Sequence, residues 1–191
     1  MPGLVDTYRA LLYKLSMKLL ISADEIADRV DVLAKEISRE YESKKLHIIV
    51  ILKGAFIFTA DLIRKLTIPF DIDFIRISTY GNNHIPDIKP STTLEHNIVV
   101  ENKDVLIIDD ILDTGNTLTS LAELSKHYGS KSVKICTLLN KPSRRQFNIN
   151  LSFCGFDIDD GFVVGYGLDY AEKYRGLPNI YVLDEEEIKR G

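Results

Sequence analysis

The chain alternates short apolar runs with stretches in which apolar residues recur at helical spacing. Continuous apolar runs at 46–52 (LHIIVIL), 105–108 (VLII) and 132–139 (SVKICTLL) are typical of strands buried on both faces of a parallel sheet. Stretches 56–66 and 118–128 keep a helical period between these runs. The alternation predicts an α/β fold with a mainly parallel central sheet flanked by helices.

Further elements are predicted at both ends of the chain and between the apolar runs. Residues 22–25 (SADE) have the pattern of a helix capping box, and the apolar positions of 26–41 continue it as a surface helix. Residues 1–21 could form a helix or a strand packed on the body, and their pattern leaves both open. Further strands are predicted at 70–79, 97–100, 151–158, 162–166 and 179–184.

The composition is that of an ordinary globular protein, with 45% hydrophobic and 27% charged residues among 191. The net charge of −4 provides no basic field, so we expect no nucleic-acid partner. No apolar run is long enough to span a bilayer, and Arg9, Lys14 and Lys18 argue against a secretory signal. Cys136 and Cys154 lie in apolar runs, which predicts buried thiols in a reducing, cytoplasmic compartment.

The stretch 105–118 (VLIIDDILDTGNTL) contains the strongest candidate chemistry. Asp109 and Asp110 follow four apolar residues, at the carboxyl end of a predicted strand, which is where open α/β sheets bind ligands. Two carboxylates would repel a phosphate group. They therefore suit sugar hydroxyls or a divalent cation.

Residues 113–117 (DTGNT) open the helix that follows. Gly115 permits a tight turn, and the hydroxyls of Thr114 and Thr117 join the free N–H groups of the helix start in a phosphate cradle. An acidic turn with a threonine cap and no ligand is the simpler alternative. The density of acids, hydroxyls and glycine in one run favours the ligand site.

Four other stretches have both a functional and a simpler interpretation. Lys53-Gly54 follows a strand and could bind a pyrophosphate or form a plain turn. Lys141 could recognise a ligand or be a solvated surface residue. Phe162 could contact a ligand or pack in the core. Asp169 could belong to a ligand site or form part of a turn. The polar residues 80–97 are either a disordered insertion or a lid over a reactive centre.

The stretch 105–118 resembles the phosphoribosyl-pyrophosphate signature of type I phosphoribosyltransferases. The chain from Ser22 to Asp184 resembles the hypoxanthine-guanine branch, with Leu52-Lys53-Gly54 and 162–170 (FVVGYGLDY) similar to its pyrophosphate loop and purine-binding segment. The resemblance implies the type I phosphoribosyltransferase fold. It implies one domain over 1–191, with a small hood built from the N-terminal residues and about 150–191.

The implied reaction is purine salvage. A 6-oxopurine, hypoxanthine or guanine, would combine with phosphoribosyl pyrophosphate to give IMP or GMP and pyrophosphate, with Mg²⁺ as cofactor. The resemblance makes Asp113 the general base for purine nitrogen 7, and neighbouring acids should raise its pKa. Asp109 and Asp110 would hold the ribose hydroxyls and, with Asp169, the metal.

The resemblance also assigns the remaining ligand contacts. The 5′-phosphate would lie on Asp113, Thr114, Gly115, Asn116 and Thr117, and the pyrophosphate on Lys53, Gly54 and Arg175. The purine would meet Lys141 at its 6-oxo group, Phe162 by stacking and the backbone of Val163. A cis peptide between Leu52 and Lys53 is implied, and Thr79-Tyr80 matches the start of the family's lid.

Two departures from the family pattern leave the choice among hypoxanthine, guanine and xanthine open. Asp109 stands where many relatives have glutamate, and Asn116 replaces a lysine found in some. A regulatory RNA-binding protein on the same fold is the rival from another class, and Asp113 and the Phe162 segment argue against it. An enzyme acting on orotate, adenine or xanthine is the rival within the fold. The resemblance alone leads us to expect a homo-oligomer, a dimer or a tetramer.

Overall fold

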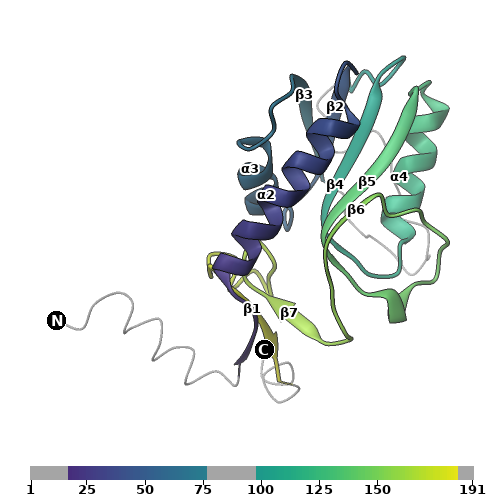
Figure 1. Cartoon of the computed structure of the whole chain (residues 1–191). Coiled ribbons are helices and arrows are strands. Elements are labelled where there is room, and N and C mark those ends of the chain that lie inside the picture. Colours follow the sequence, from purple (N-terminus) through teal and green to yellow (C-terminus); the bar gives the residue numbers. More distant parts are fainter. Residues whose placement is uncertain (1–16, 77–97, 185–191) are drawn as a thin grey trace. The chain divides into compact units, whose positions relative to one another are not determined.

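A computed structural model of the chain describes residues 17–76 and 98–184 (Figure 1). The chain divides into two compact units. The larger unit is Ala27–Asp160, and the smaller unit joins Met1–Ile26 to Gly161–Gly191. Each unit has its own sheet.

The larger unit is built on a five-stranded sheet in the order β3-β2-β4-β5-β6, in which every neighbouring pair is parallel. The strands are β2 (Leu46–Leu52), β3 (Phe70–Arg76), β4 (Asp104–Leu112), β5 (Ser132–Asn140) and β6 (Phe153–Asp157). From β2 the chain proceeds to one edge of the sheet, and from β4 it proceeds to the other. The order therefore reverses between β2 and β4, and ligands bind beside the carboxyl ends of strands at such a point.

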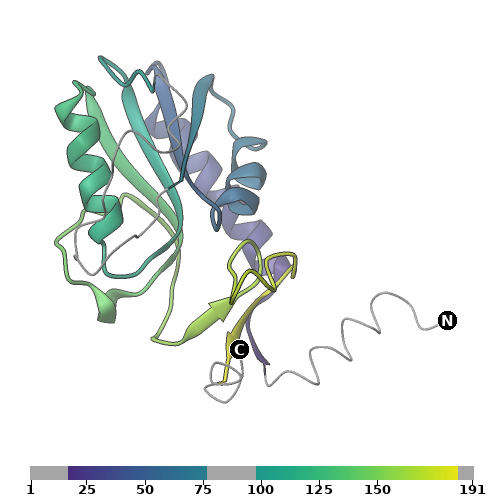
Figure 2. The same cartoon turned by 180° about the vertical axis from the view of Figure 1, so that it is seen from behind.

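Helices flank this sheet, as the sequence predicted (Figures 1 and 2). Leu118 and Leu121 of one helix pack with alternate residues of the central strands, such as Ile107, in a single apolar core. The helices are α2 (Ala23–Glu40), α3 (Phe56–Ile63) and α4 (Asn116–His127), followed by the short 3₁₀ helix η1 (Pro142–Arg144). The predicted fold class is confirmed for the larger unit.

The predicted ends of two helices are also confirmed. The Ser22 backbone N–H donates to Glu25 Oε2 at 2.8 Å, and the Glu25 N–H donates back to Ser22 Oγ at 3.3 Å, which is a reciprocal capping box. At the end of α4, Gly129 has a φ of +81°, a conformation that suits glycine after a helix.

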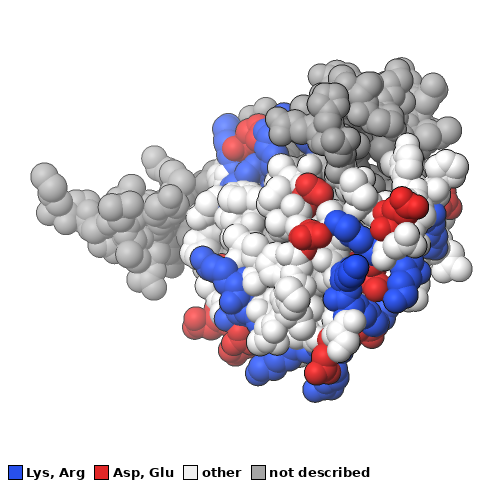
Figure 3. All heavy atoms as spheres, turned by 90° about the horizontal axis from the view of Figure 1, so that it is seen from above, with Lys and Arg blue, Asp and Glu red and all other residues white. Residues whose placement is uncertain are grey.

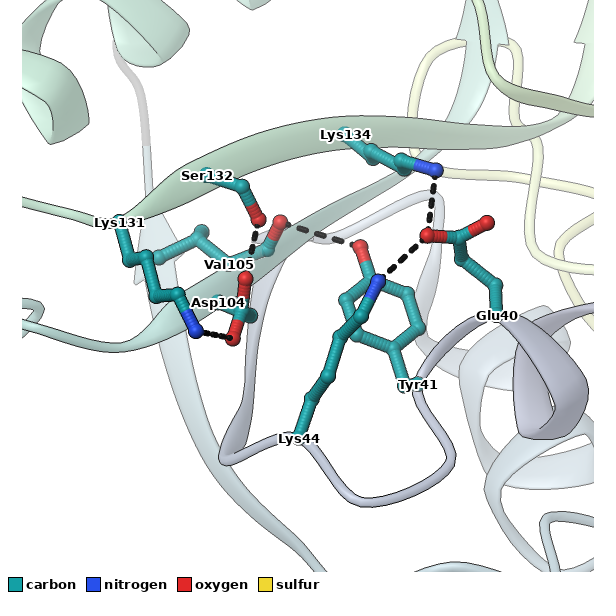
Figure 4. A network of polar contacts seen from close by, with 8 residues as sticks. All are labelled: Glu40, Tyr41, Lys44, Asp104, Val105, Lys131, Ser132 and Lys134. Atoms are coloured by element: carbon teal, nitrogen blue, oxygen red, sulfur yellow. Dashed lines mark hydrogen bonds and ion pairs between the residues drawn. The ribbon is translucent and has the colours of Figure 1, made fainter.

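The end of α2 is tied to the sheet by a polar network (Figure 4). Glu40 pairs with Lys44 at 2.6 Å and with Lys134 of β5 at 2.7 Å. Hydrogen bonds from Lys134 and Lys44 lower the pKa of Glu40 to about 2. The Tyr41 hydroxyl donates to the Val105 carbonyl at 3.3 Å, so the helix is fixed at the amino ends of β4 and β5.

The smaller unit holds a three-stranded antiparallel sheet in the order β1-β8-β7. Its strands are β1 (Met17–Ile21), β7 (Phe162–Val164) and β8 (Ile180–Leu183). The sequence left open whether residues 1–21 form a helix or a strand, and the structure shows that residues 17–21 form a strand. Val164, Leu177, Tyr181 and Leu183 form the small core of this unit.

Several predicted boundaries were wrong, and strands β6 and β7 are shorter than the predicted 151–158 and 162–166. Residues 98–100 do not form a strand, because Val100 packs into the apolar core without a ladder partner. Helix α3 ends at Ile63, short of the predicted residue 66. Strand β4 continues to Leu112, since its pairing with β5 extends to Leu112 opposite Asn140, so Asp109 and Asp110 lie inside the strand rather than after it.

The surface agrees with the composition, whereas only one of the two cysteines is buried as predicted. On the face in Figure 3, basic and acidic side chains lie interspersed. Among the helices of the described residues, none combines the length and apolar character needed to cross a membrane. Cys136 and Cys154 are free thiols, the first buried and the second half-buried, and burial raises the pKa of Cys154 to about 11.

Candidate active site

The Asp110 carboxylate of β4 lies against the turn that follows β2. Gly54 is in such close contact with Asp110 that a Cβ on the glycine would lie 1.8 Å from Asp110 Oδ2. The Asp110 N–H donates to Asp109 Oδ1 at 2.9 Å. The reversal of strand order thus brings Gly54 to Asp110 and its neighbour Asp109, which are distant from Gly54 in sequence. All three were predicted as site residues.

Asp109 is held in an environment that disfavours its charge. Burial raises its pKa well above the usual range, and the neighbouring Asp110 carboxylate raises it further. A bound cation, or hydroxyl groups that donate to the carboxylate, would offset this cost. The electrostatics therefore agree with the expectation that this pair faces a sugar or a cation.

The turn that leads from β2 to Gly54 contains a peptide bond in an uncommon conformation. The Leu52–Lys53 bond is cis, as the family resemblance implied. Lys53 is exposed, and Gly54 is half-buried.

The start of α4 has the geometry of an anion site. Gly115 occupies the N-cap position with φ +89° and ψ −3°, which confirms that this turn requires a glycine. The Thr119 N–H closes the first turn on the Gly115 carbonyl at 2.9 Å, so the N–H groups that precede it point out of the helix end. The Thr114 hydroxyl lies 3.5 Å from the Asn116 nitrogen, and Thr117 is half-buried in the same turn.

Asp113, the predicted general base, has a cation as its neighbour. Its Oδ1 lies 2.8 Å from Nε of Arg144 in η1. We expected the neighbouring acids to dominate the surroundings of this carboxylate. The sequence analysis gave Arg144 no role, although its position three residues after Lys141 was a usable signal.

Lys141, the residue that follows β5, is a buried lysine. Its side chain is 7% exposed, and its N–H donates to the Leu112 carbonyl at 2.9 Å, which joins the ends of β4 and β5. Its Nζ lies 4.0 Å from Asp160 Oδ1. Asp160 also accepts from Arg144 Nη1 at 3.2 Å, and it is a second residue that the sequence analysis missed.

In the smaller unit, the structure brings Asp169 and Arg175 together. Arg175 Nη2 lies 2.8 Å from Asp169 Oδ1 and 3.2 Å from Glu172 Oε2, and its Nη1 donates to the Gly167 carbonyl at 2.8 Å. The Glu172 N–H donates to Asp169 Oδ2 at 2.8 Å. The guanidinium is thereby held in one orientation, with a planar fork suited to phosphate oxygens.

Phe162 and Val163 share β7 but differ in exposure. The Phe162 ring is 40% exposed and meets Tyr170 edge to face, with ring centroids 5.2 Å apart. Val163 is buried and lies opposite Val182 of β8. Phe162 is thus a partly exposed aromatic residue, on which a flat ligand could stack.

Comparison with known proteins matches residues 21–171 to the family described as the phosphoribosyl transferase domain. The chain is 46% identical to the hypoxanthine-guanine phosphoribosyltransferase of Bacillus subtilis, over 87% of this chain and 92% of that protein. The chain belongs to the hypoxanthine-guanine branch of the phosphoribosyltransferase family.

Solved structures in this branch have the same fold. A hypoxanthine phosphoribosyltransferase from Staphylococcus aureus superposes with a TM-score of 0.84 at 38% identity, covering 93% of this chain and 96% of that one. The Trypanosoma cruzi enzyme in complex with the product IMP gives 0.82 at 35% identity, over 88% and 95%. The type I phosphoribosyltransferase fold is thus confirmed.

Some relatives are much longer than this chain. The chain is 42% identical to the bifunctional protein TilS/HprT of Listeria monocytogenes, over 88% of its own residues but only 26% of that protein.

Carboxylates in the larger unit of this chain suit a divalent cation that is shared with a ligand. No cluster of three or more metal-binding side chains occurs among residues 17–76 and 98–184. Mg²⁺ is usually held by one or two carboxylates together with substrate phosphates, rather than by an all-protein cage. Asp109 and Asp110 fit that description, while Asp169 is already paired with Arg175.

The lid predicted for this family member lies outside the described residues. It comprises Thr79, Tyr80 and the polar stretch to residue 97.

Proposed function

We propose that this chain transfers the phosphoribosyl group of phosphoribosyl pyrophosphate to nitrogen 9 of a 6-oxopurine. Hypoxanthine or guanine would yield IMP or GMP, and pyrophosphate would leave. The observation that supports this most directly is the sequence of groups at the end of β4. A carboxylate pair, a candidate base and a helix start with a left-handed glycine follow one another within eight residues, 109–116.

Each group suits one part of the donor substrate. The N–H groups at the start of α4, with Thr114 and Thr117, would bind the 5′-phosphate. Asp109 and Asp110 would accept hydrogen bonds from the ribose hydroxyls. Lys53, the Gly54 backbone and Arg175 would bind the pyrophosphate, which must be stabilised as it departs.

Breaking the bond between the ribose and pyrophosphate builds positive charge on the sugar. Asp109 and Asp110 would stabilise that charge. As nitrogen 9 attacks, Asp113 would accept the proton from nitrogen 7, so that the purine ends neutral. Lys141 would donate to the 6-oxo group, and Phe162 would stack on the ring beside the Val163 backbone.

Mg²⁺ fits this reaction as the cofactor. Asp109 and Asp110 would hold it together with the substrate, and Asp169 would contribute once it is released from Arg175. When bound, the ion would neutralise negative charge on the pyrophosphate.

The deciding experiment is a panel of five bases with phosphoribosyl pyrophosphate. Hypoxanthine, guanine, xanthine, adenine and orotate are each assayed with Mg²⁺ and with excess chelator. Turnover of hypoxanthine or guanine that disappears with chelator supports the proposal. Turnover of orotate or adenine alone would overturn it.

A cytoplasmic location and a homo-oligomer of two or four copies are part of the same proposal. The proposal includes no nucleic-acid or membrane partner. Light scattering on the purified chain gives the number of copies, and cell fractionation gives the location.

A further inference from the structure

Four side chains of alternating charge connect the two groups proposed to recognise the purine. Asp113 pairs with Arg144, Arg144 donates to Asp160, and Asp160 lies 4.0 Å from Lys141 Nζ. Asp113 would meet nitrogen 7, and Lys141 would meet the 6-oxo group. These two purine atoms are neighbours on the ring system, so the spacing of their two partners matters for binding in a reactive pose.

Arg144 covers one oxygen of Asp113. Asp113 Oδ1 is buried and has no hydrogen-bond partner among the described residues, but it forms an ion pair with Arg144 Nε at 2.8 Å. The Asp113 side chain as a whole is 39% exposed. The exposed part therefore lies on its other atoms, which include Oδ2. This ion pair with a planar guanidinium restrains the rotation of the carboxylate and leaves Oδ2 available to a ligand.

Asp160 fixes the guanidinium in turn. It accepts from Arg144 Nη1 at 3.2 Å, so two atoms of the same group are occupied by two different carboxylates. A lysine in place of Arg144 has one ammonium and cannot reproduce this fork. Asp160 also stands near Lys141, so it links the arginine to the second purine contact.

We infer that Arg144 and Asp160 are positioning residues that set the general base Asp113 and the lysine Lys141 at the spacing of purine nitrogen 7 and the 6-oxo group. The inference rests on the proposed function. It assigns neither residue a contact with the substrate. Its consequence is that Arg144 acts on the chemical step through Asp113 and contributes nothing to binding of the phosphoribosyl donor.

The test compares Arg144→Gln, Arg144→Lys and Asp160→Asn with the wild type, using hypoxanthine. Residues that orient a metal ligand from behind typically affect activity by about 10–100-fold, and we expect the same order for residues that orient a general base. We expect Arg144→Gln to lower kcat by a factor in that range, with KM for phosphoribosyl pyrophosphate and the melting temperature unchanged. Arg144→Lys should restore only part of the loss. Asp160→Asn should lower kcat and also raise KM for hypoxanthine, because it acts on Lys141 as well.

A double-mutant cycle separates this role from direct phosphate binding. In an Asp113→Asn background, Arg144→Gln should have no further effect on kcat, because the group it positions is already lost. Arg64→Gln is the matched control, since Arg64 pairs with Asp61 on α3 and is 73% exposed. It should leave all constants unchanged.

The outcomes distinguish failure of the inference from failure of the proposed function. If the wild type turns over no 6-oxopurine, the proposed function fails. If the wild type is active and Arg144→Gln matches it, the positioning role is wrong. A rise in KM for phosphoribosyl pyrophosphate, or a full further loss in the Asp113→Asn background, would show that Arg144 binds substrate directly.

Discussion

Gly54 and Asp110 are in contact across the point where the strand order of the sheet reverses. A Cβ on Gly54 would lie 1.8 Å from Asp110 Oδ2 and 2.4 Å from its Cγ. The carboxylate therefore occupies the space that any side chain at position 54 would need. The sequence suggested that Gly54 offers its backbone to a pyrophosphate, and the structure adds a packing reason for glycine.

Gly54→Ala should displace the Asp110 carboxylate and disrupt the site. A misplacement of about 1 Å can cost about 10²-fold in rate, and we expect a loss in kcat/KM for phosphoribosyl pyrophosphate of that order. Gly176→Ala is the matched control, because a Cβ there meets nothing within 4 Å. Equal kinetics of Gly54→Ala and the wild type would show that Asp110 moves aside without consequence.

Asp113→Asn should lower kcat by about 10²–10⁴-fold, because an amide cannot accept the proton from nitrogen 7. KM for phosphoribosyl pyrophosphate should change little. Steady-state kinetics with hypoxanthine measure both constants. A large rise in KM for the donor would instead place Asp113 on the ribose or the phosphate.

Asp109→Asn should make the protein without ligand more stable. The folded state raises the pKa of Asp109, so it binds this proton more tightly than the unfolded chain does. Stability is then lost as the pH rises from the usual 3.8 through the folded pKa, and at neutral pH the wild type bears that cost. Removing the charge should raise the free energy of unfolding, and the melting temperature should rise by about 2–4 °C for each 1 kcal/mol gained.

The same variant should lose turnover and the stabilisation that Mg²⁺ with phosphoribosyl pyrophosphate gives the wild type. Asp28→Asn, on the exposed face of α2, is the control and should change neither quantity. A drop in melting temperature for Asp109→Asn would mean that the ionised carboxylate stabilises the fold.

Lys141→Ala should narrow the preference for 6-oxopurines over adenine. An ammonium group only donates hydrogen bonds, so it suits the 6-oxo acceptor and opposes the 6-amino group of adenine. The wild type should favour hypoxanthine over adenine by about 10⁴-fold or more. Competition assays on the variant and on Lys126→Ala, an exposed control, measure the change. An unaltered preference in Lys141→Ala would show that another group reads the base.

Glu40→Gln should weaken the network at the amino ends of β4 and β5 without touching the site (Figure 4). Because Glu40 is partly exposed, we expect a loss of about 1 kcal/mol at pH 7, the upper end for surface ion pairs. The folded state lowers its pKa from 4.5 to about 2. Its contribution is therefore complete above pH 4.5 and disappears as the pH falls toward 2.

Thermal unfolding at pH 7 and at pH 3 tests the direction of this pH dependence. The difference in melting temperature between Glu40→Gln and the wild type should shrink at the lower pH. A difference that stays constant would assign the effect to packing rather than to charge.

The apolar pattern alone determined the strand cores, the helices and the parallel sheet, because burial on both faces demands continuous apolar runs. Local rules were equally sufficient at the capping box of Ser22 and at Gly115, where the constraint lies within a few residues. Even the candidate base and the carboxylate pair were identified from one contiguous stretch. The predicted site residues that the structure describes thus came largely from motifs of consecutive residues.

Only the tertiary structure decided which distant residues meet. The contact of Gly54 with Asp110 depends on β2 and β4 being neighbours, and the pairing of Asp113 with Arg144 depends on where β5 and η1 end. Nothing in a run of consecutive residues encodes such pairs. The length of β4 was misjudged for the same reason, since ladder bonds to β5 extend the strand past two polar residues that its own pattern would exclude.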